Sequence, residues 1–299
     1  MSIQTVAILS PGNMGGAIGA RMAEAGLDII TCLAGRSDYT CRKSAEAGFR
    51  DTGDLETLVR EADLVLSVLD PAKAVEIAES VATAAVETGA TLVFADCNAT
   101  SPATAGWLNA IITGVGGKFI DVGIIGGAPL PGKEMPSFAS SGPDAGLLDA
   151  IDGKGVRQLY IGPDIGQGSA IKICNGAFNK GAFALYTIVM LAAEHYGCTE
   201  FLRERLPGSQ AGSVEKLDNA ILRLPTLSGR YIGEMEQVAE TFDAIGLPPD
   251  IHRGAADLFR LLNESPLAAE RRDEIDTDRT VPDTLQALVK TLAARDGAG

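Results

Sequence analysis

The sequence TVAILSPGNMGGAIG, residues 5–19, decides the fold predicted for this chain. An apolar run at residues 6–9 is followed by Ser10, Pro11, Gly12 and Asn13, and then by a segment of small residues that begins at Met14. This order predicts a buried strand, a glycine-containing turn and a helix. The start of such a helix offers unpaired backbone N–H groups and a partial positive charge, and Gly12 lets the backbone approach phosphate oxygens. We therefore expect residues 10–14 to bind a dinucleotide pyrophosphate.

The match to the dinucleotide motif G-x-G-x-x-G is imperfect, because Ser10 stands where the first glycine is expected. Gly15 supplies the glycine that allows a helix to pack closely on its strand. A tight turn between a strand and a helix in any α/β protein is the alternative interpretation. The position of the motif, directly after a predicted strand and before a predicted helix, favours nucleotide binding.

Composition excludes several classes of partner. The 299 residues are 46% hydrophobic and 21% charged, which is typical of a soluble globular protein with one large domain or two moderate ones. The net charge of −14 argues against a nucleic-acid partner. No apolar run of membrane-spanning length and no signal peptide is apparent, so we expect no membrane association.

Cysteine and histidine usage points to a reducing compartment and to no metal site. Five cysteines show no C-x-x-C spacing, which fits a cytoplasmic protein. Only two histidines are present, His195 and His252, so a His-rich metal site is not expected. We interpret His252 as structural, and the single tryptophan, Trp107, as a core residue of a helix.

The second predicted strand, residues 29–33, indicates which nicotinamide nucleotide is used. It is followed by Arg36 and Ser37. In dinucleotide-binding folds this position meets the adenine ribose, where an acidic residue binds the hydroxyls of NAD. A guanidinium group beside a hydroxyl suits a 2′-phosphate instead, so we predict NADP rather than NAD. The alternative is a solvent-exposed loop arginine.

Strands and helices then alternate along the chain. Strands are predicted at residues 63–69, 91–96, 118–124, 137–140 and 156–161, and helices at 54–62, at 71–86 and after Pro102. This alternation predicts a parallel sheet with helices on both faces and ligands beyond the carboxyl ends of its strands. Further cofactor-binding residues are expected at those ends, namely Leu69, Asp70 and Asn98.

The glycine pair after strand 118–124 is a candidate for substrate binding. Gly126 and Gly127 lie in a loop with Pro129 and Pro131, which indicates a shaped, irregular segment. Their backbone N–H groups can face a carboxylate. A plain connection between two strands is the alternative.

A long apolar helix, predicted from Ser169 to Tyr196, carries the candidate catalytic residues. It is apolar around most of its circumference, so we expect it to be buried between domains or subunits. Lys172, Asn175 and Asn179 interrupt the apolar pattern at spacings that share one helix face. A lysine in such surroundings is costly unless it meets an anion or a cleft, so we predict a catalytic lysine. A lysine that extends to solvent from the helix start is the alternative.

Three landmarks together resemble the β-hydroxyacid dehydrogenase superfamily, which includes 6-phosphogluconate dehydrogenase. The segment from Ser10 to Gly15 resembles the family's G-x-G-x-M-G turn, Asp121 to Gly127 resembles its D-x-P-V-S-G-G substrate loop, and Gly166 to Lys172 resembles its G-x-G-x-x-x-K motif. The stretch from Gly229 to Glu236 resembles a C-terminal domain of a phosphogluconate dehydrogenase-like branch.

The resemblance implies an α/β fold in which residues 1–165 form an NADP-binding Rossmann domain with a doubly wound sheet. A long helix would link it to an all-α domain, residues 166–299, that binds substrate. The long apolar helix and the helical C-terminal half predict that the protein is a homodimer. The implied reaction is hydride transfer between NADP(H) and the hydroxyl or carbonyl carbon of a small, β-hydroxyacid-like substrate. Lys172 would be the general acid/base and Asn175 would orient it or the substrate. Ile125, Gly126, Gly127 and Asn179 would bind the substrate.

Departures from the family pattern leave other activities open. Ile125 replaces the family's substrate-loop serine, and Gly176 stands where the family carries asparagine four residues after the lysine. Ile125 and Phe178 favour a substrate that is bulkier or more apolar than a short hydroxyacid. A non-redox lyase acting by retro-aldol cleavage or proton abstraction is one alternative, and a catalytically silent nucleotide-binding protein is another.

The C-terminal half reads as helical. Amphipathic helices are predicted at residues 238–245 and 255–263. The charge run at residues 270–278 is interpreted as a solvated surface segment.

Overall fold

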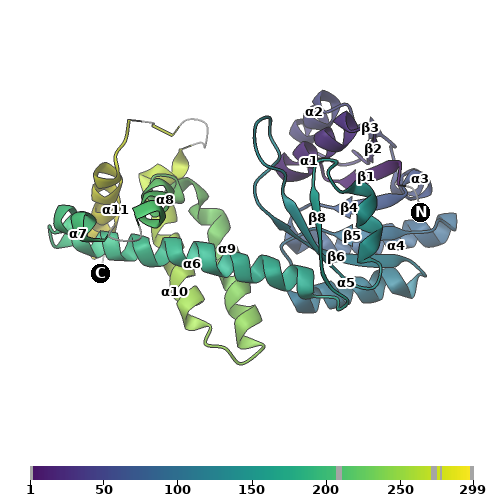
Figure 1. Cartoon of the computed structure of the whole chain (residues 1–299). Coiled ribbons are helices and arrows are strands. Elements are labelled where there is room, and N and C mark those ends of the chain that lie inside the picture. The colour runs from purple at the N-terminus through teal and green to yellow at the C-terminus, as the bar shows by residue number, and fades with distance from the viewer. Residues whose placement is uncertain (1–2, 207–210, 271–274, 277, 297–299) are drawn as a thin grey trace. The chain divides into compact units, whose positions relative to one another are not determined.

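The computed structural model describes residues 3–206, 211–270, 275–276 and 278–296 (Figure 1). Contacts divide the chain into two compact units, of which the first ends at Ile173 and the second begins at Cys174. The division falls inside the long helix α6 (Gln167–His195), a little after the domain boundary that the sequence placed at residue 165. The first two turns of α6 therefore belong to the sheet-containing unit, and the rest belongs to the helical unit.

The first unit is built on an eight-stranded sheet with the order β3-β2-β1-β4-β5-β6-β7-β8. All neighbouring strands pair in parallel except β6 and β7, which are antiparallel. The strands are β1 (Thr5–Leu9), β2 (Asp28–Thr31), β3 (Arg50–Asp51), β4 (Leu64–Ser67), β5 (Val93–Asp96), β6 (Lys118–Ile125), β7 (Ser137–Ser141) and β8 (Arg157–Gly162). Because the order reverses at β1, which lies between β2 and β4, ligands are expected at the carboxyl end of β1.

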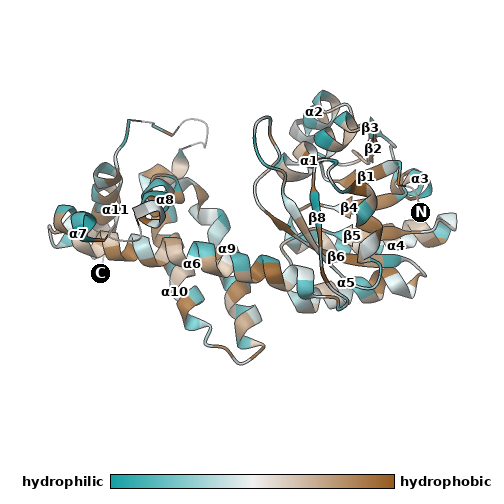
Figure 2. Cartoon of the chain, in the orientation of Figure 1, coloured by the Kyte–Doolittle hydropathy of each residue, from teal (hydrophilic) through white to brown (hydrophobic). Residues whose placement is uncertain are grey.

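Helices cover both faces of this sheet, as predicted. They are α1 (Asn13–Glu24), α2 (Asp38–Glu46), α3 (Leu55–Glu61), the short 3-10 helix η1 (Pro71–Lys73), α4 (Ala74–Thr88), α5 (Pro102–Gly114) and the 3-10 helix η2 (Ala145–Ile151). Alternate residues of β1 enter separate cores: Ile8 packs with α1 and η2, whereas Ala7 packs with α3, α4 and α5. The hydrophobic colour of the central strands in Figure 2 follows from this burial on both faces. The predicted Rossmann-like fold is confirmed.

The second unit is entirely helical in the part of the chain that the structure describes, which confirms the predicted all-α domain. Besides most of α6 it contains α7 (Thr199–Arg205), α8 (Ala211–Ile221), α9 (Leu224–Asp243), α10 (Asp250–Asn263), the 3-10 helix η4 (Pro266–Ala269) and α11 (Val281–Asp296). Helices α9 and α10 pack together through an edge-to-face contact of Tyr231 and Phe259, whose ring centroids are 5.5 Å apart. The two predicted amphipathic helices are the second halves of α9 and α10.

One prediction about burial was wrong, because Trp107 was expected in the core and is 71% exposed. Ala105, Leu108 and Ile112 form the buried face of α5, and Trp107 falls on the opposite face. Within this chain α6 is partly exposed, since Phe178 and Tyr196 are 77% and 80% exposed. Its expected burial between domains or subunits stays a prediction.

The sequence was also expected to lack a membrane-spanning run. Among the residues that the structure describes, α6 is the one helix long and apolar enough to cross a membrane by length and composition. The core helix of a soluble protein meets the same criteria, so this property does not by itself indicate a membrane. The predicted surface segment at 270–278 lies largely outside the described residues.

Candidate functional site

The turn between β1 and α1 has the form of a phosphate cradle. Gly12 is the N-cap residue of α1, and its N–H donates to the carbonyl oxygen of Ser10 at 2.7 Å. Having no side chain, Gly12 gives the first-turn N–H groups no capping acceptor, and the first turn contains no acidic residue. Helix N-termini of this kind bind anions through their backbone N–H groups and dipole.

Two glycines let α1 lie close to the sheet. A Cβ atom at Gly15 would be 3.2 Å from Cγ2 of Ile8 and 3.3 Å from Cβ of Val68, and one at Gly19 would be 2.6 Å from Cδ1 of Ile8. The glycine turn is therefore held against β1 and against the residue that follows β4. These backbone positions fit a dinucleotide pyrophosphate, for which the close approach of helix and strand is needed.

Ser10 stands at the first glycine position of the G-x-G-x-x-G motif, and its backbone conformation explains why glycine is usual there. Its φ is +60°, and it is the one non-glycine residue with positive φ in the described chain. The left-handed region costs a residue with a Cβ atom about 1–2 kcal/mol. Ser10 therefore adopts here a backbone conformation that glycine adopts without this cost.

Arg36 and Ser37 lie at the start of α2, directly after the strand that neighbours β1. Ser37 is the N-cap of α2, and its Oγ accepts from the N–H of Thr40 at 3.3 Å. The backbone N–H of Arg36 donates to Leu33. No ion pair joins the Arg36 guanidinium to a carboxylate within the described ranges. A cation beside a helix N-terminus is a suitable place for a phosphate group.

Asn98 was predicted to contact the cofactor, but its side chain is 3% exposed and bonded to protein groups. Its Oδ1 accepts from the backbone N–H of Leu69 at 2.6 Å, and its Nδ2 donates to Ser67 Oγ and to Asp96 Oδ1. Asn98 therefore joins the ends of β4 and β5. Asp70, one residue after Leu69, is exposed, and its carboxylate accepts from the N–H of Ala72 as the cap of η1.

Asp121 is a buried residue beside the site that the sequence analysis did not single out. It is fully buried on β6, and its carboxylate accepts hydrogen bonds from the start of α6. Oδ2 accepts from the N–H groups of Gly166 and Ser169 at 2.9 and 3.0 Å, and Oδ1 accepts from Ser169 Oγ at 2.6 Å. Asp121, on strand β6, thus caps the start of helix α6. Its only signal in the sequence is its place at the head of the D-x-P-V-S-G-G resemblance.

Glycines allow α6 to rest directly on the sheet backbone. A Cβ atom at Gly168 would be 2.6 Å from the carbonyl oxygen of Asp121 and 2.8 Å from that of Ala139. On the facing strand, a Cβ at Gly123 would be 3.2 Å from Cβ of Lys172 and would clash with the carbonyl of Gly168. The glycines of the G-x-G-x-x-x-K segment therefore determine how close to the sheet the Lys172 side chain begins.

Lys172 reaches the carboxyl end of β6. Its Nζ donates to the carbonyl oxygen of Ile124 at 2.5 Å, and its side chain is half-buried. Cys97, at the end of β5, senses the charge of Lys172. Burial raises the pKa of the Cys97 thiol well above its ordinary value, and the carboxylates of Asp96 and Asp121 raise it further, whereas the ammonium of Lys172 lowers it. The ammonium is therefore close to the strand ends where the sequence predicted a cleft.

The glycine loop begins beside the Lys172 contact. Ile125 is the last residue of β6 and pairs with Ser137 of β7. Gly126 has φ of +113°, which only glycine adopts readily, and a Cβ there would be 3.4 Å from Cα of Pro136. Gly127 has open space around its Cα. Both glycines are exposed, so their backbone faces a region that a ligand can enter.

Asn175 and Asn179 belong to the second unit. Nδ2 of Asn179 donates to the backbone oxygen of Asn175 at 2.8 Å and to its Oδ1 at 3.0 Å. Lys216 of α8 donates to Oδ1 of Asn179 at 3.4 Å. The two asparagines thus form a polar pair on one face of α6.

The comparisons with known proteins agree with this architecture. The family model for the NAD binding domain of 6-phosphogluconate dehydrogenase matches residues 5–145. A domain of unknown function, DUF1932, matches residues 193–262. Residues 5–145 thus form a domain of the NAD-binding type of 6-phosphogluconate dehydrogenase, and a DUF1932 domain follows it. The first unit of the chain therefore carries an NAD(P)-binding domain.

Individual proteins that resemble this chain are distant in sequence. The Uncharacterized 28.5 kDa protein in 7S RNA 5'region of Methanothermus fervidus is 27% identical over 239 residues, which are 80% of this chain and 91% of that protein. A conserved hypothetical protein from Sinorhizobium meliloti has a TM-score of 0.73, with 21% identity over 97% of both chains. The 3-hydroxyisobutyrate dehydrogenase of Mycobacterium tuberculosis, solved with L-serine, has a TM-score of 0.70, with 18% identity over 96% of this chain and 99% of that chain. The likeness to the two solved structures shows the fold of this chain.

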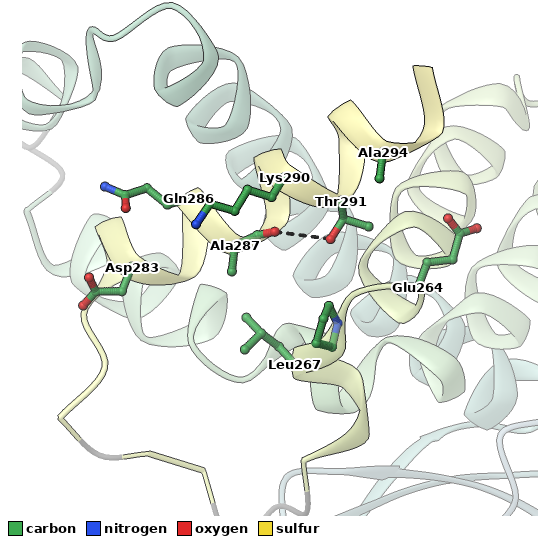
Figure 3. Close-up of a pocket in the computed structure, with 9 residues that line it drawn as sticks. Glu264, Leu267, Asp283, Gln286, Ala287, Lys290, Thr291 and Ala294 are labelled. Carbon is green, nitrogen blue, oxygen red and sulfur yellow. Dashed lines mark hydrogen bonds between the residues drawn. The ribbon is translucent and has the colours of Figure 1, made fainter. Parts of the chain in front are cut away.

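A cavity of about 450 Å³ lies in the helical unit (Figure 3). It is formed by η4 and α11, with Leu267 and Ala287 on its wall and Asp283 and Lys290 among its polar groups. None of the site residues predicted from the sequence lines it. Among the described residues, no group of three or more His, Cys, Asp or Glu side chains is placed to hold a metal ion.

Proposed function

We propose that this protein is an NADP(H)-dependent oxidoreductase that transfers a hydride to or from the hydroxyl or carbonyl carbon of a small, β-hydroxyacid-like molecule. The observation that carries the proposal is the placement of Lys172 at the carboxyl end of β6, in the unit that also contains the glycine turn of an NAD(P)-binding domain. A bound nicotinamide nucleotide supplies the redox chemistry, and the protein supplies positions and charges.

The cofactor would be held by residues 10–14 and by the neighbouring strand ends. The N–H groups at the start of α1 would bind the pyrophosphate, and Arg36 with the N-terminus of α2 would bind the 2′-phosphate of NADP. Leu69 and Asp70 would contact the nucleotide through the segment that follows β4. The lack of a carboxylate partner for Arg36 within the described ranges supports NADP, because the guanidinium fork is available to a phosphate.

Lys172 would act as general acid/base at the substrate oxygen. The carbonyl oxygen of Ile124 accepts a hydrogen bond from the ammonium and so orients Nζ. An ammonium has three N–H donors, with which it can meet its protein partners and a substrate oxygen. Exposed N–H groups of Gly126 and Gly127 would bind a substrate carboxylate. Asn175 and Asn179 would orient the substrate from the helical domain.

The substrate side of the site favours an apolar component. Ile125 replaces a hydroxyl-bearing residue at the mouth of the glycine loop, and Phe178 presents a 77% exposed ring on α6. A side chain of either kind cannot donate a hydrogen bond to a small hydroxyacid. We infer a substrate larger or less polar than 3-hydroxyisobutyrate-type acids.

The protein is further proposed to act as a cytoplasmic homodimer. Leu185 and Tyr196, like Phe178, are large apolar residues on the exposed face of α6, at 67% and 80% exposure. A second copy covering this face would remove the apolar surface from water. Light scattering should give twice the chain mass, and Leu185→Glu should shift the protein to the monomer. All five cysteines are free, which is compatible with a reducing cytoplasm.

The test of the proposed function is a thermal-shift comparison of NADPH, NADH and a panel of apolar-substituted hydroxy and oxo acids, followed by assays at 340 nm. A ligand that binds the folded protein raises the unfolding temperature by mass action. Stabilisation by NADPH above NADH, with turnover that requires Lys172, is the expected result. Lys172-dependent turnover without any nicotinamide binding would instead favour the lyase alternative.

A further inference from the structure

A buried polar chain links the end of β5 to the glycine turn. Asp96, the last residue of β5, is 1% exposed, and its Oδ1 accepts from Nδ2 of Asn98 at 2.5 Å. Oδ1 of Asn98 accepts from the backbone N–H of Leu69 at 2.6 Å. Leu69 follows Val68, whose Cβ would be 3.3 Å from a Cβ atom added at Gly15. The chain therefore ends beside the helix start where the pyrophosphate is expected.

The carboxylate of Asp96 sets which way the Asn98 amide points. The two ends of an amide are nearly equal in shape but opposite in hydrogen bonding. If the amide were reversed, its oxygen would face the carboxylate of Asp96, and its NH₂ group would face the N–H of Leu69. Both contacts would be repulsive in a buried site, where an unmade hydrogen bond is costly. Asp96 thus makes Asn98 an acceptor toward Leu69.

Both donors of Asn98 are used, which makes its position well defined. The second N–H of Nδ2 donates to Ser67 Oγ at 2.9 Å, and the N–H of Cys97 donates to the backbone oxygen of Ser67 at 2.9 Å. The end of β4 is therefore tied to β5 by side-chain and backbone contacts together. The Asn98 side chain is thus held by Ser67 of β4 and by Asp96 of β5. Among the contacts of the described residues, its Oδ1 serves as acceptor for the Leu69 N–H alone.

We propose that Asp96 is a positioning residue for nucleotide binding, which orients the Asn98 amide so that it holds the Leu69 N–H and the segment after β4 beside the glycine turn. Neither side chain touches the nucleotide in this scheme. Asn98 is then a support for the cofactor site rather than the cofactor ligand that the sequence suggested. The inference rests on the proposed function for its binding readout, but not for its structural readout.

An exchange of the two residues tests the proposal. Asn98→Asp places a second carboxylate against Asp96, and we expect it to weaken NADPH binding about tenfold or more. The double variant Asp96→Asn, Asn98→Asp restores an amide donor facing a carboxylate, with the second carboxylate oxygen at position 98 available to Leu69. Binding should recover to within about threefold of wild type. Thr88→Val, which removes a hydrogen bond in the last turn of α4, is the control for a general loss of stability.

Amide hydrogen exchange of Leu69, measured by NMR without nucleotide, separates this inference from the proposed function. Exchange should be faster in Asn98→Asp, unchanged in Thr88→Val and slow again in the double variant. Should Asn98→Asp not fold, Asn98→Leu removes the acceptor without adding charge and serves in its place. A wild-type exchange rate of Leu69 in Asn98→Asp or Asn98→Leu overturns the proposal, and so does a folded double variant in which Leu69 exchanges as fast as in Asn98→Asp. If exchange follows this pattern but the protein binds no NADPH, the positioning of Leu69 by Asp96 and Asn98 is supported and only the proposed cofactor is wrong.

Discussion

The ammonium of Lys172 donates a hydrogen bond to the carbonyl oxygen of Ile124, across the point where α6 rests on β6. The contact is possible because Asp121 caps the start of α6 and because glycine at positions 123 and 168 lets helix and strand approach. Lysine, strand end and helix start thus form one rigid assembly within the first unit. A general acid/base needs this kind of fixed position relative to its substrate.

Lys172→Ala should abolish turnover and leave NADPH binding intact. Removing a general acid/base costs about 10²–10⁴-fold in rate, whereas the glycine turn and Arg36 are unchanged in the variant. Steady-state kinetics and NADPH titration measure the two effects. Lys154→Ala, on the turn before β8, is the matched control and should behave as wild type. Equal rates in Lys172→Ala and wild type would remove this lysine from the mechanism.

Arg36→Ala should weaken NADPH binding by about 10–100-fold and NADH binding by much less. The expected loss corresponds to one charge-assisted hydrogen-bonding group on the 2′-phosphate. Fluorescence titration with both nucleotides gives the ratio. Arg60→Ala, an exposed arginine on α3, should change neither affinity. If both nucleotides lose affinity equally in Arg36→Ala, the arginine does not select NADP.

Ser10→Gly should stabilise the protein by about 1 kcal/mol. The wild-type residue has φ of +60°, and glycine avoids the cost of a Cβ atom in this region. Part of the gain in stability is lost, because glycine also makes the unfolded chain more flexible. Urea unfolding without nucleotide measures the change. Ser10→Ala keeps the unfavourable backbone and should gain nothing, so it separates the effect of the backbone from that of the hydroxyl. A stability gain in the alanine variant alone would contradict the backbone explanation.

The sheet could be predicted from the sequence because buried parallel strands are short apolar runs between turn signals. Residues 6–9 and 118–124 are examples, and the structure places β1 and β6 there within a residue or two. The antiparallel direction of β7 was not predicted, since a strand's direction depends on the long glycine loop before it and not on its own residues.

Side-chain roles in the site were harder to predict than positions. Asp121 bonds to residues 20 to 48 positions away, and no local pattern reveals such partners. Asn98 was correctly placed at a strand end, yet its amide is occupied by Leu69 and Asp96 rather than exposed. Trp107 shows the same limit for the helices, because α5 buries a narrow face of small and aliphatic residues and leaves the largest ring outside.

The stability of Asp96→Asn relative to that of wild type should increase between pH 4 and pH 7. Burial, reinforced by Asp121, raises the pKa of Asp96 from 3.8 to about 7 in the folded protein. Between these values the folded state binds the proton and the unfolded state does not, so wild-type stability falls as pH rises from about 4 to 7. The fall is at most about 4 kcal/mol and then stays constant, because each pKa unit is worth about 1.4 kcal/mol.

The asparagine variant has no titrating group at this position, so the difference from wild type isolates Asp96 from other carboxylates. Urea unfolding of both proteins from pH 4 to pH 8 measures it. Asp54→Asn, an exposed helix cap whose carboxylate has a pKa lowered by its hydrogen bonds to Thr57, should show the opposite trend. A difference that does not grow between pH 4 and 7 would show that Asp96 is already ionised in the folded protein.

Gly168→Ala should destabilise the first unit by about 3 kcal/mol or prevent folding, and it should reduce turnover in any protein that folds. The added Cβ would meet the backbone oxygens of Asp121 and Ala139 at 2.6 and 2.8 Å, and neither can move without displacing a strand. The start of α6 would have to lift from the sheet, which moves Lys172 away from Ile124. Gly233→Ala is the matched control, since this glycine lies inside α9 with no atom near its added Cβ. That variant should gain up to about 1 kcal/mol from helix propensity. Urea unfolding measures the change in the free energy of unfolding for both variants. A loss for Gly168→Ala with a gain for Gly233→Ala would show that the close approach at Gly168, and not helix propensity, sets the position of Lys172. A gain in both variants would refute this explanation.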